Sequence, residues 1–153
     1  MSALPSPPAM ARLVGTLVDK AVRVSAGTAR CVPAYVALYV DDSGRDVIAC
    51  LVDRTLVAVF GAALALIPPG VAAEAAKSPS ISELLLSNAY EVLNVLAAAF
   101  NESAPESEHV RLRALRIITD VPQKLTAAMQ RVDFDVTVTS YVTGRLAIVV
   151  LPK

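Results

Sequence analysis

The sequence predicts an α+β fold in which a mostly antiparallel sheet is covered by long helices. Two observations support this fold class. The expected elements follow the order helix, three strands, two or three helices, three strands, which separates runs of strands from runs of helices. In addition, a turn sequence at 41–44 (Asp-Asp-Ser-Gly) joins two β-rich segments, as in an antiparallel hairpin.

The composition is that of one apolar domain with no overall charge. Of the 153 residues, 55% are hydrophobic but only 5% are aromatic, so the core must consist mainly of Ala, Val and Leu. Fourteen basic residues balance fourteen acidic ones, and we therefore expect no nucleic-acid partner. The longest apolar run, 56–67, has twelve residues, whereas a membrane span needs about 20. We expect no membrane insertion.

The N-terminus and the cysteines indicate a cytoplasmic protein. Residues 1–10 have no positive charge before their apolar residues and no long apolar core, so they do not resemble a signal peptide. Cys31 and Cys50 lack the spacing of a zinc site, and we expect both to be reduced and buried. Asp41 and Asp42 resemble half of a calcium loop, but the other ligands are missing, so we expect a turn and no metal site.

We divide the chain into a disordered N-terminus, 1–8, and a single domain, 9–153. Residues 6–8 (Ser-Pro-Pro) can also cap and begin a helix, since proline suits the first helical turn. Apolar residues at three- and four-residue steps continue this helix to about Lys20. The alternating segment 22–25 predicts the first strand.

The next segments predict a hairpin followed by helices. Residues 34–40 and 46–52 are β-rich on either side of the predicted turn. An apolar helix is expected at 54–67. Three prolines between 68 and 80 then interrupt the chain, around a short helical stretch at 71–77.

A long helix is expected from Ile81 to Asn101. Ser80 followed three residues later by Glu83 has the form of a capping box. Apolar residues then cover so much of the circumference that we expect the helix to be largely buried. They are Ile81, Leu84, Leu85, Leu86, Ala89, Val92, Leu93, Val95, Leu96, Ala99 and Phe100.

Strands are expected again in the C-terminal part of the chain. The acidic segment 102–108 predicts an exposed loop, and 109–118 predicts a strand. We expect a short helical segment within 121–131 and a strictly alternating strand at 132–141. The final strand, 145–151, is apolar enough to pair either within the sheet or across a dimer.

Polar residues of the long helix collect on one line, which comprises Glu83, Ser87, Glu91, Asn94 and Asn101. Ser87, Glu91 and Asn94 lie at i, i+4 and i+7 and therefore share one face. The helix contains no Lys or Arg, whereas a purely solvating stripe tends to carry mixed charge. These three residues form either a solvated edge of the helix or a small polar site.

The pattern Ser87-x-x-x-Glu91-x-x-Asn94 resembles the signature of the CheC/CheX chemotaxis phosphatases, in which Asp or Ser, Glu and Asn recur at these spacings and a proline follows. The predicted order of helices and strands also resembles the CheX arrangement. Members of this family hydrolyse the aspartyl-phosphate of a phosphorylated response regulator. The resemblance therefore implies a response regulator as the partner, a possible homodimer and a function in two-component signalling.

The resemblance also implies a role for each motif residue. Asn94 would orient the attacking water, Glu91 would engage a lysine of the partner, and Ser87 would support them. Phosphoryl transfer depends mainly on positioning and on the management of charge, which suits a carboxamide beside a carboxylate. The chain would need no cofactor of its own, because the response regulator would supply the Mg²⁺.

Two features depart from the family pattern. Pro122 lies 28 residues beyond Asn94, which is further than the family spacing. The predicted N-terminal helix contains no Glu and no Asn, so that only the single-motif, CheX-like version is possible. The alternative is a non-catalytic interaction or assembly module on the same fold, akin to the related flagellar-switch proteins.

The remaining charged residues have simpler interpretations. His109 is the only histidine and stands next to the acidic loop, where no Ser or Cys constellation can be assembled around it, so we expect a surface or strand-edge role. Arg111, Arg113 and Arg116 could form a patch for an anionic partner, but Asp133 and Asp135 alternate along a later predicted strand, which offers a simpler account. We expect cross-strand ion pairs between them.

Overall fold

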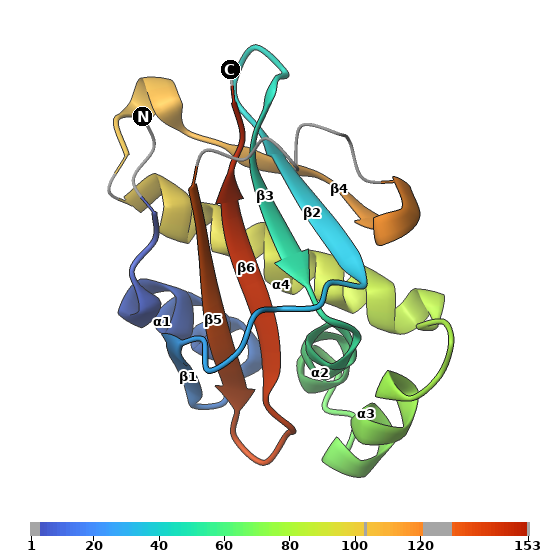
Figure 1. The fold of residues 1–153 in the computed structure, drawn as a ribbon. Coiled ribbons are helices and arrows are strands. Elements are labelled where there is room, and N and C mark those ends of the chain that lie inside the picture. Colours follow the sequence, from blue (N-terminus) through green and yellow to red (C-terminus); the bar gives the residue numbers. More distant parts are fainter. Residues whose placement is uncertain (1–3, 103, 121–129, 153) are drawn as a thin grey trace.

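The described residues form one six-stranded sheet in the order β1-β5-β6-β3-β2-β4 (Figure 1). The structure is a computed structural model and describes residues 4–102, 104–120 and 130–152. Every neighbouring pair of strands is antiparallel, which confirms the predicted α+β class. The strands are β1 (Val22–Ala26), β2 (Tyr35–Val40), β3 (Asp46–Val52), β4 (Arg111–Ile117), β5 (Gln130–Val138) and β6 (Gly144–Val150).

Helices cover one face of this sheet, and the longest of them runs across the strands (Figure 1). Apolar side chains of α1, α2 and α4 join those of the strands in one large core. The helices are α1 (Pro7–Val18), α2 (Arg54–Leu64), α3 (Pro69–Ala76) and α4 (Glu83–Glu102), with short 3-10 turns η1 (Glu106–Glu108) and η2 (Ile118–Asp120).

Strand β2, between β3 and β4, is buried on both faces. Tyr35, Ala37 and Tyr39 belong to the core on the helical side, whereas Val36 and Leu38 belong to a smaller apolar cluster on the opposite side. This alternation follows from the two-residue period of a strand. Because both faces are covered, the strand reads as a continuous apolar run in the sequence.

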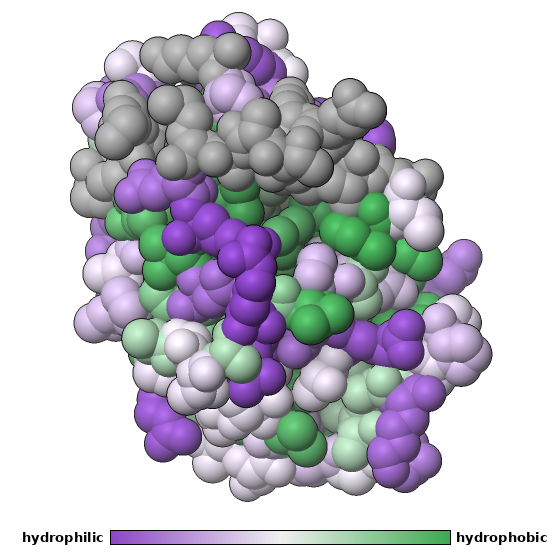
Figure 2. Space-filling model, viewed as in Figure 1, coloured by the Kyte–Doolittle hydropathy of each residue, from purple (hydrophilic) through white to green (hydrophobic). Residues whose placement is uncertain are grey.

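The connection from β1 to β2 crosses the sheet face opposite the helices (Figure 1). These two strands follow each other in the sequence but are separated in the sheet by β5, β6 and β3. Cys31, from the crossing segment 27–34, is buried against this face. Seen from the same side, a band of hydrophilic side chains lies between apolar ones (Figure 2).

Helix α4 begins at Glu83, two residues later than predicted. The Leu85 amide donates to the Ser82 hydroxyl at 3.3 Å, so Ser82 rather than Ser80 caps the helix and the predicted capping box is wrong. Leu84, which we expected on the buried face, has 61% of its surface exposed. Its neighbour Leu85, about 100° further around the helix, is the residue of this turn that faces the core.

Other boundaries also differ from the prediction. Helix α2 ends at Leu64, because Leu66 adopts a left-handed backbone conformation with φ of 60°. The helical segment expected within 121–131 lies mostly outside the described residues. Its last two residues, Gln130 and Arg131, belong to β5 instead.

The first described residues are already part of the fold. The Ala9 amide donates to the Ser6 hydroxyl at 3.2 Å, which caps α1 as the sequence predicts. Pro7 and Pro8 lie in α1, so the boundary drawn at residue 9 falls inside this helix. Leu4 packs against the core. Within 4–102, 104–120 and 130–152, no helix is long and apolar enough to cross a membrane.

Candidate functional site

Helix α4 has one buried side and one exposed sector. On a helix of about 100° per residue, the exposed residues fall within a sector about 100° wide. We call these residues the α4 sector: Glu83, Leu84, Ser87, Glu91, Asn94, Ala98 and Glu102. The buried residues point the opposite way: Leu85, Ala89, Val92, Leu93, Leu96, Ala97, Ala99 and Phe100. Apart from Asn101, which is half-buried, the expected polar line lies on this exposed side.

Ser87, Glu91 and Asn94 all lie in the α4 sector and are exposed. Their spacing places them within about 60° of one another around the helix, and side chains at such steps are neighbours. None of the three side chains forms a hydrogen bond or ion pair with another residue of the described parts of the chain. A hydroxyl, a carboxylate and a carboxamide are thus together at the surface with their hydrogen-bonding groups free for a partner.

A buried tyrosine attaches α4 to the sheet beneath the sector. The hydroxyl of Tyr39, on β2, donates to the backbone carbonyl of Leu93 at 2.6 Å. Burial raises the pKa of Tyr39 well above its usual value, so this hydroxyl stays protonated and remains a donor. The rings of Tyr39 and Phe100 also pack in a T-shaped arrangement, with centroids 4.9 Å apart. Leu93 precedes Asn94, and the anchor therefore lies directly under the motif.

A second polar contact joins α4 to α2. The side chain of Asn88 donates to the backbone carbonyl of Gly61 at 3.2 Å. At the same crossing, a Cβ atom on Gly61 would lie only 2.4 Å from the carbonyl oxygen of Leu85. The absence of a side chain at Gly61 thus permits the close approach of the two helices.

The C-terminal end of α4 is held by Asn101, which we had expected on the exposed polar line. Its side chain donates to the Val110 carbonyl at 2.9 Å and accepts from the Val110 amide at 2.8 Å. Asn101 therefore satisfies the backbone amide and carbonyl of Val110, directly before β4, and does not belong to the α4 sector. At the surface nearby, Arg12 of α1 forms an ion pair with Glu102.

The expected cross-strand ion pairs are absent from the described residues, because three strands separate β4 from β5 in the sheet. Arg113 instead forms a two-pronged pair with Asp46, with both distances 3.0 Å. Asp133 pairs with Arg131, and Asp135 pairs with Arg145. The ring of His109 lies 3.1 Å from the Ala104 carbonyl oxygen.

Polar contacts also attach the crossing segment 27–34 to the sheet. The hydroxyl of Thr28 donates to Asp135 at 2.8 Å, and the amide of Cys31 donates to Asp133 at 2.7 Å. Hydrogen bonds from Arg131 and the Cys31 amide hold the pKa of Asp133 below its usual value. Burial raises the pKa of the Cys31 thiol to about 12, so this thiol is not a nucleophile at neutral pH.

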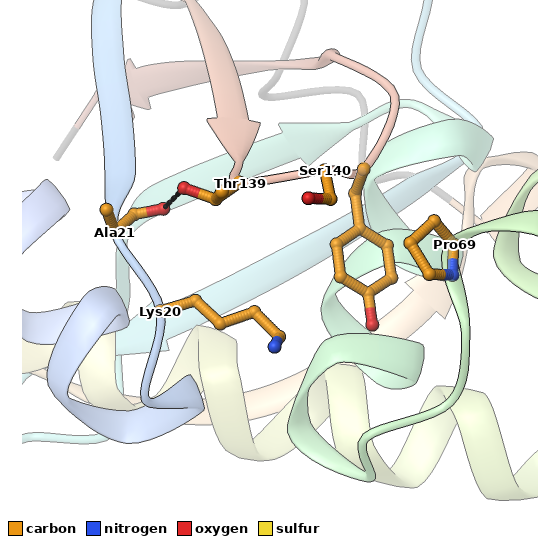
Figure 3. Close-up of a pocket in the computed structure, with 6 residues that line it drawn as sticks. Lys20, Ala21, Pro69, Thr139 and Ser140 are labelled. Atoms are coloured by element: carbon orange, nitrogen blue, oxygen red, sulfur yellow. Dashed lines mark hydrogen bonds between the residues drawn. The ribbon is translucent and has the colours of Figure 1, made fainter.

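A separate, open pocket of about 410 Å³ lies where the β5–β6 turn meets the ends of α1 and α3 (Figure 3). Thr139 donates to the Ala21 carbonyl at 2.8 Å, and Tyr141 donates to the Ile67 carbonyl at 2.5 Å. Both hydroxyl protons are therefore engaged, which leaves Lys20 and Ser140 as the side-chain donors among the residues drawn. None of the lining residues comes from α4. Within the described residues, no cluster of three or more potential metal ligands occurs.

No family model and no curated protein matches the chain. Several solved structures do. FliY of Thermotoga maritima is 13% identical, with a TM-score of 0.63 over 94% of this chain and 82% of that chain. A chain from the FliG–FliM complex of H. pylori is 9% identical, with a TM-score of 0.67 over 95% and 86%.

The middle domain of FliM from Vibrio alginolyticus is 10% identical, with a TM-score of 0.63 over 95% of this chain and 88% of that chain. A chain from the FliM–SpeE complex of H. pylori is also 10% identical, with a TM-score of 0.66. Identities this low establish a shared fold and leave the chemistry of the site to the residues themselves.

Sequence patterns did not identify Tyr39 and Asn88 as the residues that hold α4 in place. Tyr39 lies in a strand of apolar residues, so its sequence context predicts a core position and gives no sign of its hydrogen bond. Asn88 interrupts the apolar face of the long helix, and a polar residue at such a position signals a buried hydrogen bond. Its partner could not be identified, because Gly61 lies 27 residues away and offers only a backbone carbonyl.

Proposed function

We propose that this protein promotes hydrolysis of the aspartyl-phosphate of a response regulator, and that the α4 sector is its catalytic surface. The observation that carries this proposal is the exposure of Ser87, Glu91 and Asn94 on one face, with no partner among the described residues. The contacts of Tyr39 and Asn88 beneath them support it further. A surface that acts on another protein needs groups that are both free and held in place.

In the proposed reaction, water attacks the phosphorus atom and the bond between phosphorus and the carboxyl oxygen breaks. The products are the free aspartate of the regulator and inorganic phosphate. Asn94 can accept a hydrogen bond from the water and donate one to it, which fixes the direction of attack. Glu91 would pair with a lysine of the regulator, and Ser87 would assist in docking. The Mg²⁺ that neutralises the phosphoryl oxygens would belong to the regulator.

The proposal also covers the cellular setting. We place the activity in the cytoplasm, with a response regulator as the partner and with no role for nucleic acid or membrane insertion. A homodimer is compatible with this function, since the α4 sector occupies one helix and leaves other surfaces available.

The decay of a phosphorylated response regulator, encoded in the same genome, tests the proposal. Addition of this protein should accelerate the loss of phosphate. Asn94→Ala should reduce the acceleration by about 100-fold, because the attacking water is no longer oriented. Glu91→Gln should also weaken it. Glu106→Gln, an exposed acid in η1 outside the α4 sector, serves as the matched control and should act like the wild type.

A second candidate function is a non-catalytic interaction module. It is favoured by the shared fold with chains from the FliG–FliM and FliM–SpeE complexes. In that case the protein should bind a partner protein and leave the lifetime of the regulator's phosphate unchanged. Unaltered decay across several regulators, with folded protein, would favour this second function over the first.

A further inference from the structure

We propose that Leu84 is an apolar anchor for the response regulator and determines which regulators the protein accepts. This inference rests on the proposed function and adds a requirement on the partner. Leu84 precedes Asn94 by ten residues, which corresponds to about 15 Å along the helix axis. The regulator should therefore carry an apolar patch about 15 Å from its phosphorylated aspartate.

The exposure of Leu84 is the first observation behind this assignment. Among the described residues, Leu84 is the one large apolar side chain of α4 that is counted as exposed, with 61% of its surface accessible. Isolated apolar residues are common on protein surfaces and need no explanation by themselves. What distinguishes Leu84 is its place in the α4 sector. It lies within about 20° of Glu91 around the helix, and about 80° from Asn94.

The arrangement of the α4 sector is the second observation. In chain order, the α4 sector consists of Glu83, Leu84, Ser87, Glu91, Asn94, Ala98 and Glu102. A protein that brings its phosphoryl group to Asn94 and lies along the helix must cover neighbouring residues of the sector. Towards the C-terminus it meets Ala98, which offers little apolar surface, and Glu102, which is already paired with Arg12. Towards the N-terminus it meets Leu84, the larger apolar contact.

Binding energetics give this contact a definite role. Apolar surface that is covered on association stabilises the complex equally before and during the reaction, so it affects affinity rather than the chemical step. Asn94 acts on the water and should affect the chemical step. Leu84 and Asn94 thus divide recognition and catalysis between two parts of the α4 sector.

The test compares binding and turnover for three variants. Binding of the regulator is measured by calorimetry with Mg²⁺ and beryllofluoride, which mimics the phosphorylated state, and turnover is measured from phosphate decay. Leu84→Ala should raise Kd and the half-saturating protein concentration by about tenfold, with the maximal rate unchanged. Asn94→Ala should lower the maximal rate and leave Kd within about threefold. Leu66→Ala, whose side chain is 72% exposed outside α4, is the control and should match the wild type.

The outcomes separate the two proposals. If the wild type accelerates decay and Leu84→Ala binds as tightly as the wild type, the anchor is refuted and the phosphatase stands. An equal loss of affinity in Leu66→Ala would also refute it, since the effect would then not belong to the α4 sector. If the wild type does not alter decay of any regulator, the phosphatase fails, and the anchor proposal fails with it.

Discussion

The three asparagines of α4 have identical side chains but different roles, because each meets different neighbours. Asn88 donates to the Gly61 carbonyl, Asn101 exchanges two hydrogen bonds with Val110, and Asn94 is exposed in the α4 sector. Two of these carboxamides therefore stabilise the fold by satisfying backbone groups. Asn94 alone of the three has its donor and acceptor available to a partner.

This difference leads to a prediction for Asn88 and Asn94. Asn88→Ala should lower the free energy of unfolding by about 1 kcal/mol, because it removes a partly buried hydrogen bond. Asn94→Ala should change it by less than about 0.5 kcal/mol, as expected for an exposed side chain without a partner. Urea unfolding measures both values. A loss of stability in Asn94→Ala as large as in Asn88→Ala would contradict the assignment of Asn94 as free.

At the scale of elements, the crossing of α2 and α4 determines how the candidate site is presented. Gly61 meets the backbone of Leu85, two residues before Ser87. Tyr39 holds the same helix from the sheet, and Asn101 holds its far end. Contacts of this kind leave α4 little freedom to rotate, so that its polar stripe faces outwards along its whole length.

Gly61 and Gly70 provide a matched test of this crossing. A Cβ atom on Gly61 would lie 2.4 Å from the oxygen and 2.8 Å from the Cα of Leu85, and backbone cannot move away as a flexible side chain can. Gly61→Ala should therefore destabilise the protein by about 2 kcal/mol, in spite of the higher helix propensity of alanine. Gly70, in α3, has open space around its Cβ position, and Gly70→Ala should stabilise by about 0.5 kcal/mol.

Thermal unfolding of the two variants measures these effects. Opposite signs for the two Gly→Ala changes are the expected result. If Gly61→Ala were as stable as Gly70→Ala, the close contact between α2 and α4 would not exist in solution.

For the whole molecule, the crossing segment 27–34 runs over the sheet face opposite the helices. Its attachment depends on carboxylates of β5: Asp133 accepts from the Cys31 amide, and Asp135 accepts from Thr28. Arg131 also donates to the Cys31 carbonyl at 3.2 Å. The segment and its partners lie at opposite ends of the sequence, so these contacts join distant parts of the chain.

Stability should therefore fall in acid. Hydrogen bonds from Arg131 and from Cys31 lower the pKa of Asp133, and those from Thr28 lower the pKa of Asp135. A carboxyl group with a lowered pKa contributes stability above its unfolded pKa of about 4, and this contribution is lost as the pH falls through the folded pKa. Asp53 acts in the opposite direction, because burial raises its pKa.

Asp133→Asn tests this dependence. The variant should be less stable than the wild type at pH 7 but should lose less stability between about pH 4 and pH 2, because one of the titrating carboxyl groups is gone. Urea midpoints measured across this range give the slope. A wild-type slope in Asp133→Asn would show that the attachment of segment 27–34 does not depend on this carboxylate.

Much of the fold and part of the candidate site could be predicted from the sequence. The hairpin of β2 and β3, the helices α1, α2 and α4 and the common face of Ser87, Glu91 and Asn94 were all expected. Each of these features depends on residues within a few positions of one another, where helix and strand geometry determine which side chains share a face. The ends of elements were less certain, as the cap at Ser82 shows, because neighbouring serines compete for the same role.

Only the tertiary structure decided which polar side chains are free and which are engaged. The sequence placed Asn94 and Asn101 on one line, yet Asn101 faces Val110 while Asn94 remains exposed. It also paired arginines of β4 with aspartates of β5, which the strand order keeps apart. The physical reason is that a hydrogen bond or ion pair needs both groups within about 3 Å. Local periodicity determines which way a side chain points, and the folding of distant segments determines what it meets there.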